Sequence, residues 1–405
     1  MTHEDKLGRF AALCVLAGVD LRWGQELIVS APMEARSFVG HVAVAAYRAG
    51  ASLVTCLYED PELIRARFDH AIDESLDRAA GWLSDGVVKA YENGAARLFV
   101  YGPYPDLLAG VAPERIGRMH AAMAAATAQE GAFTSGLRVN WCAVPYVTQS
   151  WARMVYPALP VAEATTRLWD ELFDILRVTA PDPVVAWRDQ VEALEVRRHM
   201  LQSLDLRALH FLGGGTDLTV GLADGHRWVG GRSRAANGAM PICNFPTEEV
   251  FTCPHRERAE GRLVASRPLA LGGAIVDGLV VTFRNGLIER VEAREGQAML
   301  ETLLSSDAGA RRLGEIGLVP GGSLIARKKT LFYNALLDEN AASHVAFGQS
   351  YSACIESGRD QEAAGANSSA MHLDCMVGHD ALDVDGILCG GERRAIMRGG
   401  DFVLV

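Results

Sequence analysis

Short apolar runs alternate with longer amphipathic stretches through the first half of the chain. The runs at 25–30 (QELIVS) and 52–58 (SLVTCLY) are typical of buried strands, and 35–48 has the spacing of an amphipathic helix. Strands that alternate with helices of this length predict crossover connections and a mostly parallel, helix-covered sheet. The further strands that we expect here are 97–101 and 137–144, and the further helices are 61–71, 75–92, 113–129, 148–156, 161–178 and 183–204.

After about residue 205 the pattern changes to short strands separated by glycine-rich turns. Turn signals occur at Gly213–Gly215, at Gly272–Gly273 and at Asn285-Gly286, and the last is a hairpin signal. The strands that we expect are 208–212, 217–222, 263–266, 279–284 and 287–291, with helices at 295–305 and near 331–339. The sequence therefore predicts an α/β N-terminal domain over 1–195 with a mostly parallel sheet, and a β-rich α+β C-terminal domain over 196–405.

Composition and charge narrow the class of protein. With 49% hydrophobic residues in 405, the chain can bury real cores, which excludes disorder. A net charge of −11 argues against a broad nucleic-acid-binding face, so we expect no nucleic-acid partner. The longest apolar run, 10–19, is too short to span a membrane, and no secretory signal pattern is visible, so we expect a cytoplasmic protein. The eight cysteines include no C-x-x-C pair, which favours reduced thiols.

The sharpest candidate for chemistry is the segment MHLDCMV. On a strand, alternate residues share a face, so His372 and Asp374 would project together and could converge on one metal ion or on adjacent ions. The same spacing also fits a surface strand whose polar face meets water.

Three other segments carry residues that can bind metal ions. Glu248 and Glu249 are adjacent in TEEVFT, so in an extended segment they point to opposite faces; one can be a ligand and the other a proton-transfer or supporting group. Glu315 lies in GEIGLVP, His344 lies in an apolar stretch that equally suits a core histidine, and Tyr351 follows it.

Taken together, these residues form a plausible ligand set for two divalent ions. Three carboxylates (Glu249, Glu315, Asp374) and one hydroxide balance the charge of two divalent ions, and His344 and His372 complete the set. Carboxylate and imidazole without thiolate suit Zn, Co, Mn or Mg better than a structural zinc site.

In these segments the chain resembles the aminopeptidase T / aminopeptidase S family of bacterial dinuclear metallo-aminopeptidases. The resemblance covers nearly the whole chain and includes the four polar segments in order. Its other motifs are Gly24-Gln25-Glu26, Ala49-Gly50-Ala51, Trp151-Ala152, Leu168-Trp169 and Gly215-Thr216-Asp217-Leu218. Two departures are Cys375, where the family usually has an aromatic residue, and a less typical segment around His344.

The resemblance implies a role for each candidate residue. The metal ligands would be Glu249, Glu315 as the bridging carboxylate, His344, His372 and Asp374. Tyr351 would donate a hydrogen bond to the developing oxyanion, and Glu248 or Glu315 would relay a proton.

The implied activity is release of N-terminal residues from peptides with a free N-terminus, by water activated between two divalent ions. The resemblance also implies a homodimer, with the N-terminal domain in dimerisation and substrate access and the C-terminal domain in catalysis.

Two alternatives remain open at this point. A mononuclear iron ring-cleaving dioxygenase of the same fold family, acting on dihydroxypyridines, would use only His344, His372 and Asp374, and has no need of Glu249 and Glu315. A non-catalytic binding scaffold would be favoured by a missing ligand, and none is missing.

Overall fold

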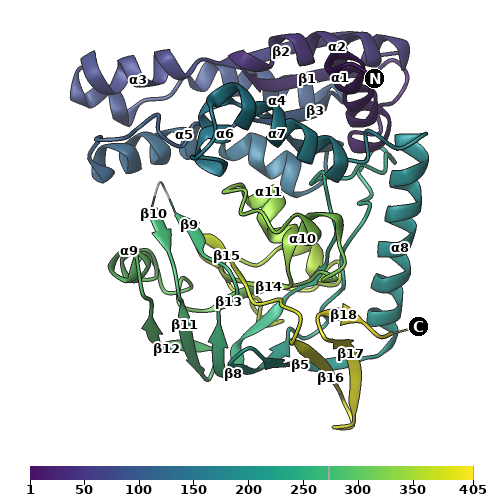
Figure 1. Cartoon of the computed structure of the whole chain (residues 1–405), viewed down its shortest axis with the longest axis vertical. Coiled ribbons are helices and arrows are strands. Elements are labelled where there is room, and N and C mark those ends of the chain that lie inside the picture. The colour runs from purple at the N-terminus through teal and green to yellow at the C-terminus, as the bar shows by residue number, and fades with distance from the viewer. Residues whose placement is uncertain (272–273, 405) are drawn as a thin grey trace. The chain divides into compact units, whose positions relative to one another are not determined.

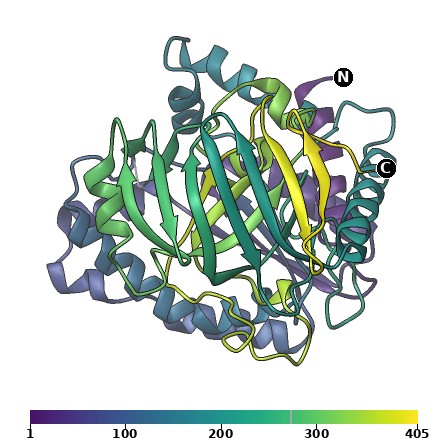
Figure 2. The same cartoon turned by 90° about the horizontal axis from the view of Figure 1, so that it is seen from below.

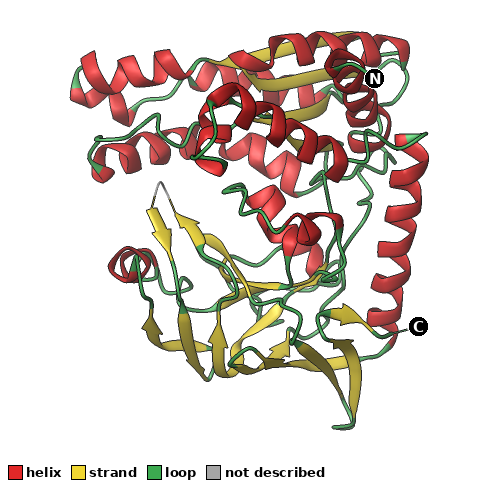
Figure 3. Cartoon of the chain, in the orientation of Figure 1, coloured by secondary structure: helices red, strands yellow, loops and turns green. Residues whose placement is uncertain are grey.

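The computed structural model describes residues 1–271 and 274–404 and divides into two compact units (Figures 1 and 3). Unit 1 comprises Met1–Arg188 and Arg232–Pro246, and unit 2 comprises Asp189–Gly231 and the chain from Thr247. The predicted turn at Gly272–Gly273 lies outside the described residues. Across the described residues, no helix has both the length and the apolar character that a membrane span requires.

Unit 1 is built on a four-stranded parallel sheet, as the alternation of strands and helices predicts. Its strands, in the order β2-β1-β3-β4, are β1 (Glu26–Pro32), β2 (Leu53–Glu59), β3 (Ala96–Tyr101) and β4 (Trp141–Pro145). The helices are α1 (His3–Leu13), α2 (Arg36–Arg48), α3 (Pro61–His70), α4 (Gly81–Glu92), α5 (Pro113–Ser135), α6 (Gln149–Val155) and α7 (Val161–Ile175). Helix α8 (Pro183–Ser203) begins in unit 1 and ends in unit 2.

Two predicted elements of this half are wrong at their starts. The predicted helix 75–92 forms only from Gly81, because the preceding Asp73–Asp77 is a 3-10 turn whose two terminal carboxylates pair with Arg118 of α5. The predicted strand 137–144 begins at Trp141, since Leu137 adopts a positive φ of 49° just after α5 ends.

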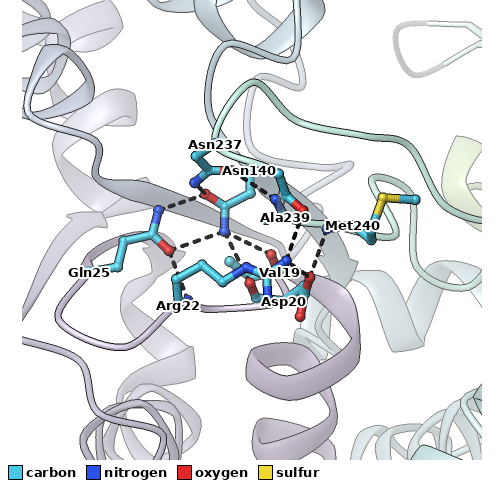
Figure 4. A network of polar contacts seen from close by, with 9 residues as sticks. Val19, Asp20, Arg22, Gln25, Asn140, Asn237, Ala239 and Met240 are labelled. Atoms are coloured by element: carbon cyan, nitrogen blue, oxygen red, sulfur yellow. Dashed lines mark hydrogen bonds and ion pairs between the residues drawn. The ribbon is translucent and has the colours of Figure 1, made fainter.

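A buried asparagine ties the segment 232–246 to the rest of unit 1 (Figure 4). Asn140, directly before β4, is fully buried and donates from Nδ2 to the carbonyl of Val19 (3.0 Å) and to Gln25 Oε1 (3.2 Å). Its Oδ1 accepts from Gln25 Nε2 (2.7 Å) and from Asn237 Nδ2 (3.0 Å). The amide therefore satisfies polar groups from two separate stretches of chain, 19–25 and the segment that contains Asn237.

Unit 2 is built on two large sheets, with a two-stranded sheet of β9 and β10 and short helices beside them (Figures 1 and 2). The eight-stranded antiparallel sheet has the order β12-β11-β8-β6-β5-β16-β17-β18, and the four-stranded antiparallel sheet has the order β15-β14-β13-β7. A single core cluster contains Phe211 and Val281 of the large sheet and Ile316 and Phe347 of the small one, so the two sheets pack face to face.

The elements of unit 2 extend the predicted strand set. The strands of the large sheet are β5 (Leu206–Gly213), β6 (Thr216–Leu222), β8 (Pro254–Val264), β11 (Val280–Arg284), β12 (Leu287–Glu292), β16 (Asp383–Leu388), β17 (Arg393–Arg398) and β18 (Asp401–Phe402). Those of the small sheet are β7 (Val250–Thr252), β13 (Leu313–Leu318), β14 (His344–Gly348) and β15 (His372–Met376). The remaining elements are β9 (Leu269–Leu271), β10 (Ala274–Val276), α9 (Gln297–Leu303), α10 (Leu324–Lys328) and α11 (Ala335–Asp338).

The predicted hairpin at Asn285-Gly286 is confirmed between β11 and β12, as is the class of each half: α/β, then β-rich. The predicted strand 263–266 is only the end of the much longer β8, and the predicted helix near 331–339 shortens to α11 and a following 3-10 turn, Glu339–Ala341.

Replacing Asn140 with alanine should destabilise unit 1. The change leaves the carbonyl of the buried Val19 and the half-buried Gln25 side chain without this partner, which we expect to cost about 1–3 kcal/mol of unfolding free energy. Urea unfolding followed by tryptophan fluorescence measures this, because every tryptophan except Trp228 lies in unit 1. Asn93→Ala, at an exposed site, is the control; equal stability of the two variants would contradict the role given to Asn140.

Candidate metal centre

The small sheet of unit 2 is apolar on one face and polar on the other. Ile316, Val345, Phe347 and Cys375 belong to the core cluster that packs against the large sheet. Because side chains alternate along a strand, the residues between them point to the opposite face. This second face carries the candidate ligands.

Strand register brings these ligands together. Glu315 of β13 pairs with Ala346 of β14, which in turn pairs with Asp374 of β15, so the two carboxylates flank an alanine across three strands. One step along the same face, Gly317 pairs with His344. The small residues Ala346 and Gly317 leave room between the longer side chains.

The predicted ligands form two groups that share one carboxylate. Glu249, Glu315 and His344 offer ligand atoms that all lie within 4.8 Å of one another, and so do Glu315, His372 and Asp374. Glu315 Oε1 lies 4.0 Å from His344 Nε2, and its Oε2 lies 3.2 Å from His372 Nε2. The two oxygens of Glu315 therefore face different imidazoles.

Both histidines are held with Nε2 toward the carboxylates. Nδ1 of His344 contacts the backbone carbonyl of Ala342 at 3.2 Å, and Nδ1 of His372 contacts that of Gln349 at 2.9 Å. A carbonyl can only accept, so Nδ1 carries the proton in each case and Nε2 is free to act as a ligand. Both Nε2 atoms also lie close to a second carboxylate: Glu249 for His344 (3.2 Å) and Asp374 for His372 (3.3 Å).

The donor set fits divalent cations. Glu249 Oε2 is buried and, although it lies 3.2 Å from His344 Nε2, it makes no hydrogen bond with any described residue, as expected for an oxygen that has a metal ion as its partner. At Gly317, a Cβ atom would lie 2.4 Å from His344 Nε2 and 2.9 Å from Glu249 Oε2. The backbone thus leaves open a space that these two ligand atoms border.

The electrostatics show that carboxylates dominate the centre. Burial, with the nearby charge of Glu249, raises the pKa of Glu315 to about 7. Burial alone would lower the pKa of both histidines, but Glu249 and its neighbours raise that of His344 to about 10, and Asp374 and Glu315 raise that of His372 to about 11. Without cations, the imidazoles hold protons that offset the carboxylates, so metal binding must release them.

One further acidic residue beside this centre, Glu339, was not predicted from the sequence. Glu339 follows α11, and its pKa is raised well above the usual range by burial and by the charges of Glu249 and Asp374. The adjacent Asp338 fixes the turn by accepting backbone N–H groups of Phe332 (2.8 Å) and Asn334 (2.9 Å). In the sequence the only signal is an acidic pair just before the strand that begins at His344, which resembles an ordinary helix end.

Tyr351 and Glu248 lie outside the two ligand groups. The Tyr351 ring lies 4.9 Å from that of His372, centroid to centroid, and burial together with the charge of Glu315 raises the pKa of its hydroxyl, which therefore keeps its proton. Glu248 is buried and accepts a hydrogen bond from Gln190 Nε2 (2.8 Å), while its backbone N–H donates to Asn340 Oδ1 (2.7 Å).

A cavity of about 280 Å³ lies beside the centre. His372, Asp374 and Glu339 line it together with Tyr333 and Asp338. Three carboxyl groups on its wall suit a cationic group of a ligand.

Comparisons with known proteins agree with this chemistry. Residues 3–402 match the family of thermophilic metalloproteases (M29). The chain belongs to this family, the aminopeptidase T / aminopeptidase S family. It is 45% identical to aminopeptidase T of Thermus thermophilus over 99% of both chains, and 36% identical to aminopeptidase 2 of Geobacillus stearothermophilus over 98% of both. The solved structure of wild-type AmpT from Thermus thermophilus superposes with a TM-score of 0.95 and 44% identity over the whole of both chains.

The resemblance found in the sequence is thereby confirmed, together with the fold class. The protein is a metal-dependent aminopeptidase, a hydrolase of peptide bonds. The dioxygenase and the non-catalytic scaffold are not favoured.

A methyl group at position 317 should damage the centre although every ligand residue is retained. In Gly317→Ala the new Cβ would lie 2.3 Å from His344 Cε1, so the imidazole must move. We expect affinity for divalent ions to fall about tenfold or more, as for changes that misorient a ligand. Equilibrium dialysis with elemental analysis measures this. Gly390→Ala, where the Cβ meets nothing within 4 Å, should bind ions normally, and equal affinity in both variants would count against the space assigned to Gly317.

Proposed function

We propose that the aminopeptidase works through a dinuclear centre of Zn, Co, Mn or Mg ions. The observation that carries this proposal is the position of Glu315, whose two carboxylate oxygens face two separate groups of candidate ligands. One group contains Glu249 and His344, and the other contains His372 and Asp374. Glu339 adds a fourth carboxylate, so the acidic side chains alone match the charge of two divalent ions.

The ligands and the substrate-directed residues have different tasks. When bound, the two ions would lower the pKa of a water molecule so that hydroxide is available near neutral pH. Glu315 would hold the two groups of ligands in a fixed relation, and it is also, with Glu248, a candidate for relaying a proton from that water.

Tyr351 and Glu248 are the candidates for steps at the substrate. The Tyr351 ring lies next to His372 and its hydroxyl keeps its proton, so it can donate a hydrogen bond to the oxygen of the scissile carbonyl as negative charge develops there. Glu248, held by Gln190, is the second candidate for passing a proton to the leaving amine.

Selection for a free N-terminus is proposed at the cavity beside the centre. The carboxyl groups of Asp374, Glu339 and Asp338 line this cavity and can accept hydrogen bonds from the α-amino group of a peptide. The proposed substrates are therefore peptides with an unblocked N-terminus, and the released product is an amino acid.

The homodimer, with unit 1 serving in dimerisation and substrate access, is proposed on the family resemblance. Sedimentation velocity of the full chain measures the oligomeric state directly.

The dinuclear centre is tested by replacing the shared carboxylate. Metal-stripped protein should regain hydrolysis of aminoacyl-anilides and dipeptides when Co, Zn, Mn or Mg is added, with two ions bound per chain. Glu315→Gln should bind at most one ion tightly and lose about a thousandfold or more in kcat/KM, since it disturbs both groups at once. The exposed Glu392→Gln is the matched control.

Other outcomes of the same experiment are equally informative. Full activity with a single ion bound per chain would contradict the dinuclear proposal, but the protein would still be a metal-dependent aminopeptidase. Oxygen consumption with ferrous iron and a dihydroxypyridine, without peptide hydrolysis, would instead support the iron-dependent alternative.

Tyr351→Phe should separate catalysis from metal binding. The phenyl ring keeps the contact with His372 but removes the donor, so we expect about a hundredfold lower kcat with unchanged ion content and little change in KM. Steady-state kinetics and elemental analysis measure the three quantities. Full activity of this variant would rule out Tyr351 as the oxyanion donor, and Glu248→Gln tests the proton relay in the same assays.

A further inference from the structure

Unit 1 contains a second cavity, of about 310 Å³, along its sheet. The wall reaches from Arg97, the second residue of β3, to residues at or near the carboxyl ends of β1, β2 and β3. Ser30 and Ala31 of β1, Glu59 of β2 and Tyr101 of β3 border it on the sheet side, and α5 closes the other side with Glu130. Its volume lies at the small end of the range for ligand pockets, which begins at about 300 Å³.

The position of the cavity in the sheet is the one that parallel α/β folds use for ligands. From β1 the chain first passes to β2 on one side, and later to β3 and β4 on the other side. The direction of winding therefore reverses between β1 and β3. Ligands of open parallel sheets bind at the carboxyl ends of the strands at such a reversal.

A buried arginine lies in the wall of this cavity. Arg97 of β3 is only 4% exposed, and its Nη2 donates to Ser30 Oγ at 2.6 Å. Its Nε and Nη1 are buried and make no hydrogen bond with any described residue. A buried guanidinium with unused donors calls for an anionic partner, because an unpaired charge is costly to bury.

The rest of the wall adds features that a simple anion would not use. The carboxylates of Glu59 and Glu130 line the same cavity, so it has both a cationic and an anionic part. The centroid of the Phe99 ring lies 4.7 Å from Cζ of Arg97. The same ring stacks on the ring of Tyr101, with 6.0 Å between the two centroids. These rings offer an apolar surface between the charges.

We propose that this cavity binds a free α-amino acid. The carboxylate would pair with Arg97, the ammonium group would pair with Glu130 or Glu59, and an apolar side chain would lie on Phe99 and Tyr101. A zwitterion satisfies both parts of the wall, whereas a carboxylate without an ammonium group would meet two like charges. The cavity lies within unit 1, and binding there does not depend on the dinuclear centre.

Calorimetric titration of the full chain tests the site, with and without a chelator so that binding at the metal centre is separated from it. The probes are L-leucine, 4-methylpentanoate (no ammonium group), leucinamide (no carboxylate) and the dipeptide Leu-Leu. We expect leucine to bind in the presence of chelator, at least tenfold more tightly than either single-charge analogue.

Variants then assign the binding to the cavity. Arg97→Met, which nearly preserves volume, should weaken leucine binding tenfold or more, while Arg36→Met, at an exposed arginine of the same unit, should leave it unchanged. Glu130 is half-exposed on α5, a position where folding tolerates change. Glu130→Gln should weaken the binding of leucine but not that of 4-methylpentanoate.

The proposal fails if leucine does not bind the chelated protein, or if Arg97→Met and Glu130→Gln both leave its affinity unchanged. Equal binding of leucine and 4-methylpentanoate would overturn the zwitterion in favour of a simple anion. Tighter binding of Leu-Leu would overturn the free amino acid in favour of a peptide. None of these results bears on peptide hydrolysis, which the chelator abolishes.

Discussion

Like charges crowded on one face of the small sheet are the constraint on which the centre of unit 2 depends. Glu249, Glu315, Asp374 and Glu339 share an interior where water cannot screen them, and each raises the cost of ionising its neighbours. Two imidazoles offset part of this charge only while they remain protonated. Without cations, protons on the imidazoles and on Glu339 offset the remaining charge, so metal binding is coupled to proton release.

The surrounding structure accommodates this constraint through backbone features. The carbonyls of Ala342 and Gln349 fix the orientation of the two imidazoles. Position 317 is a glycine, so no side chain enters the space beside His344 and Glu249. The apolar face of the same strands packs into the core, which makes the sheet rigid. Ligands placed on such strands keep their separations more closely than ligands on loops.

The parts of the protein that could be predicted are those with a local signal. The H-x-D spacing of β15 and the Asn285-Gly286 hairpin are short-range patterns, and the structure has both elements. Strands β13 and β14 are buried on both faces, so polar and apolar residues do not alternate clearly along them. Only their polar residues could be recognised from the sequence. Glu339 and Arg97 gave no signal, because what distinguishes them is burial beside charges or strands distant in the sequence.

The return of residues 232–246 to unit 1 has a consequence for synthesis of the chain. Neither unit is a continuous stretch of sequence, because the chain passes from unit 1 to unit 2, returns to unit 1 and then enters unit 2 a second time. During translation, Asn140 therefore emerges from the ribosome well before Asn237, and the first strands of unit 2 emerge between them. Nascent unit 1 has to wait with part of its polar interior unpaired, and no single cut in the gene can separate the two units as intact pieces.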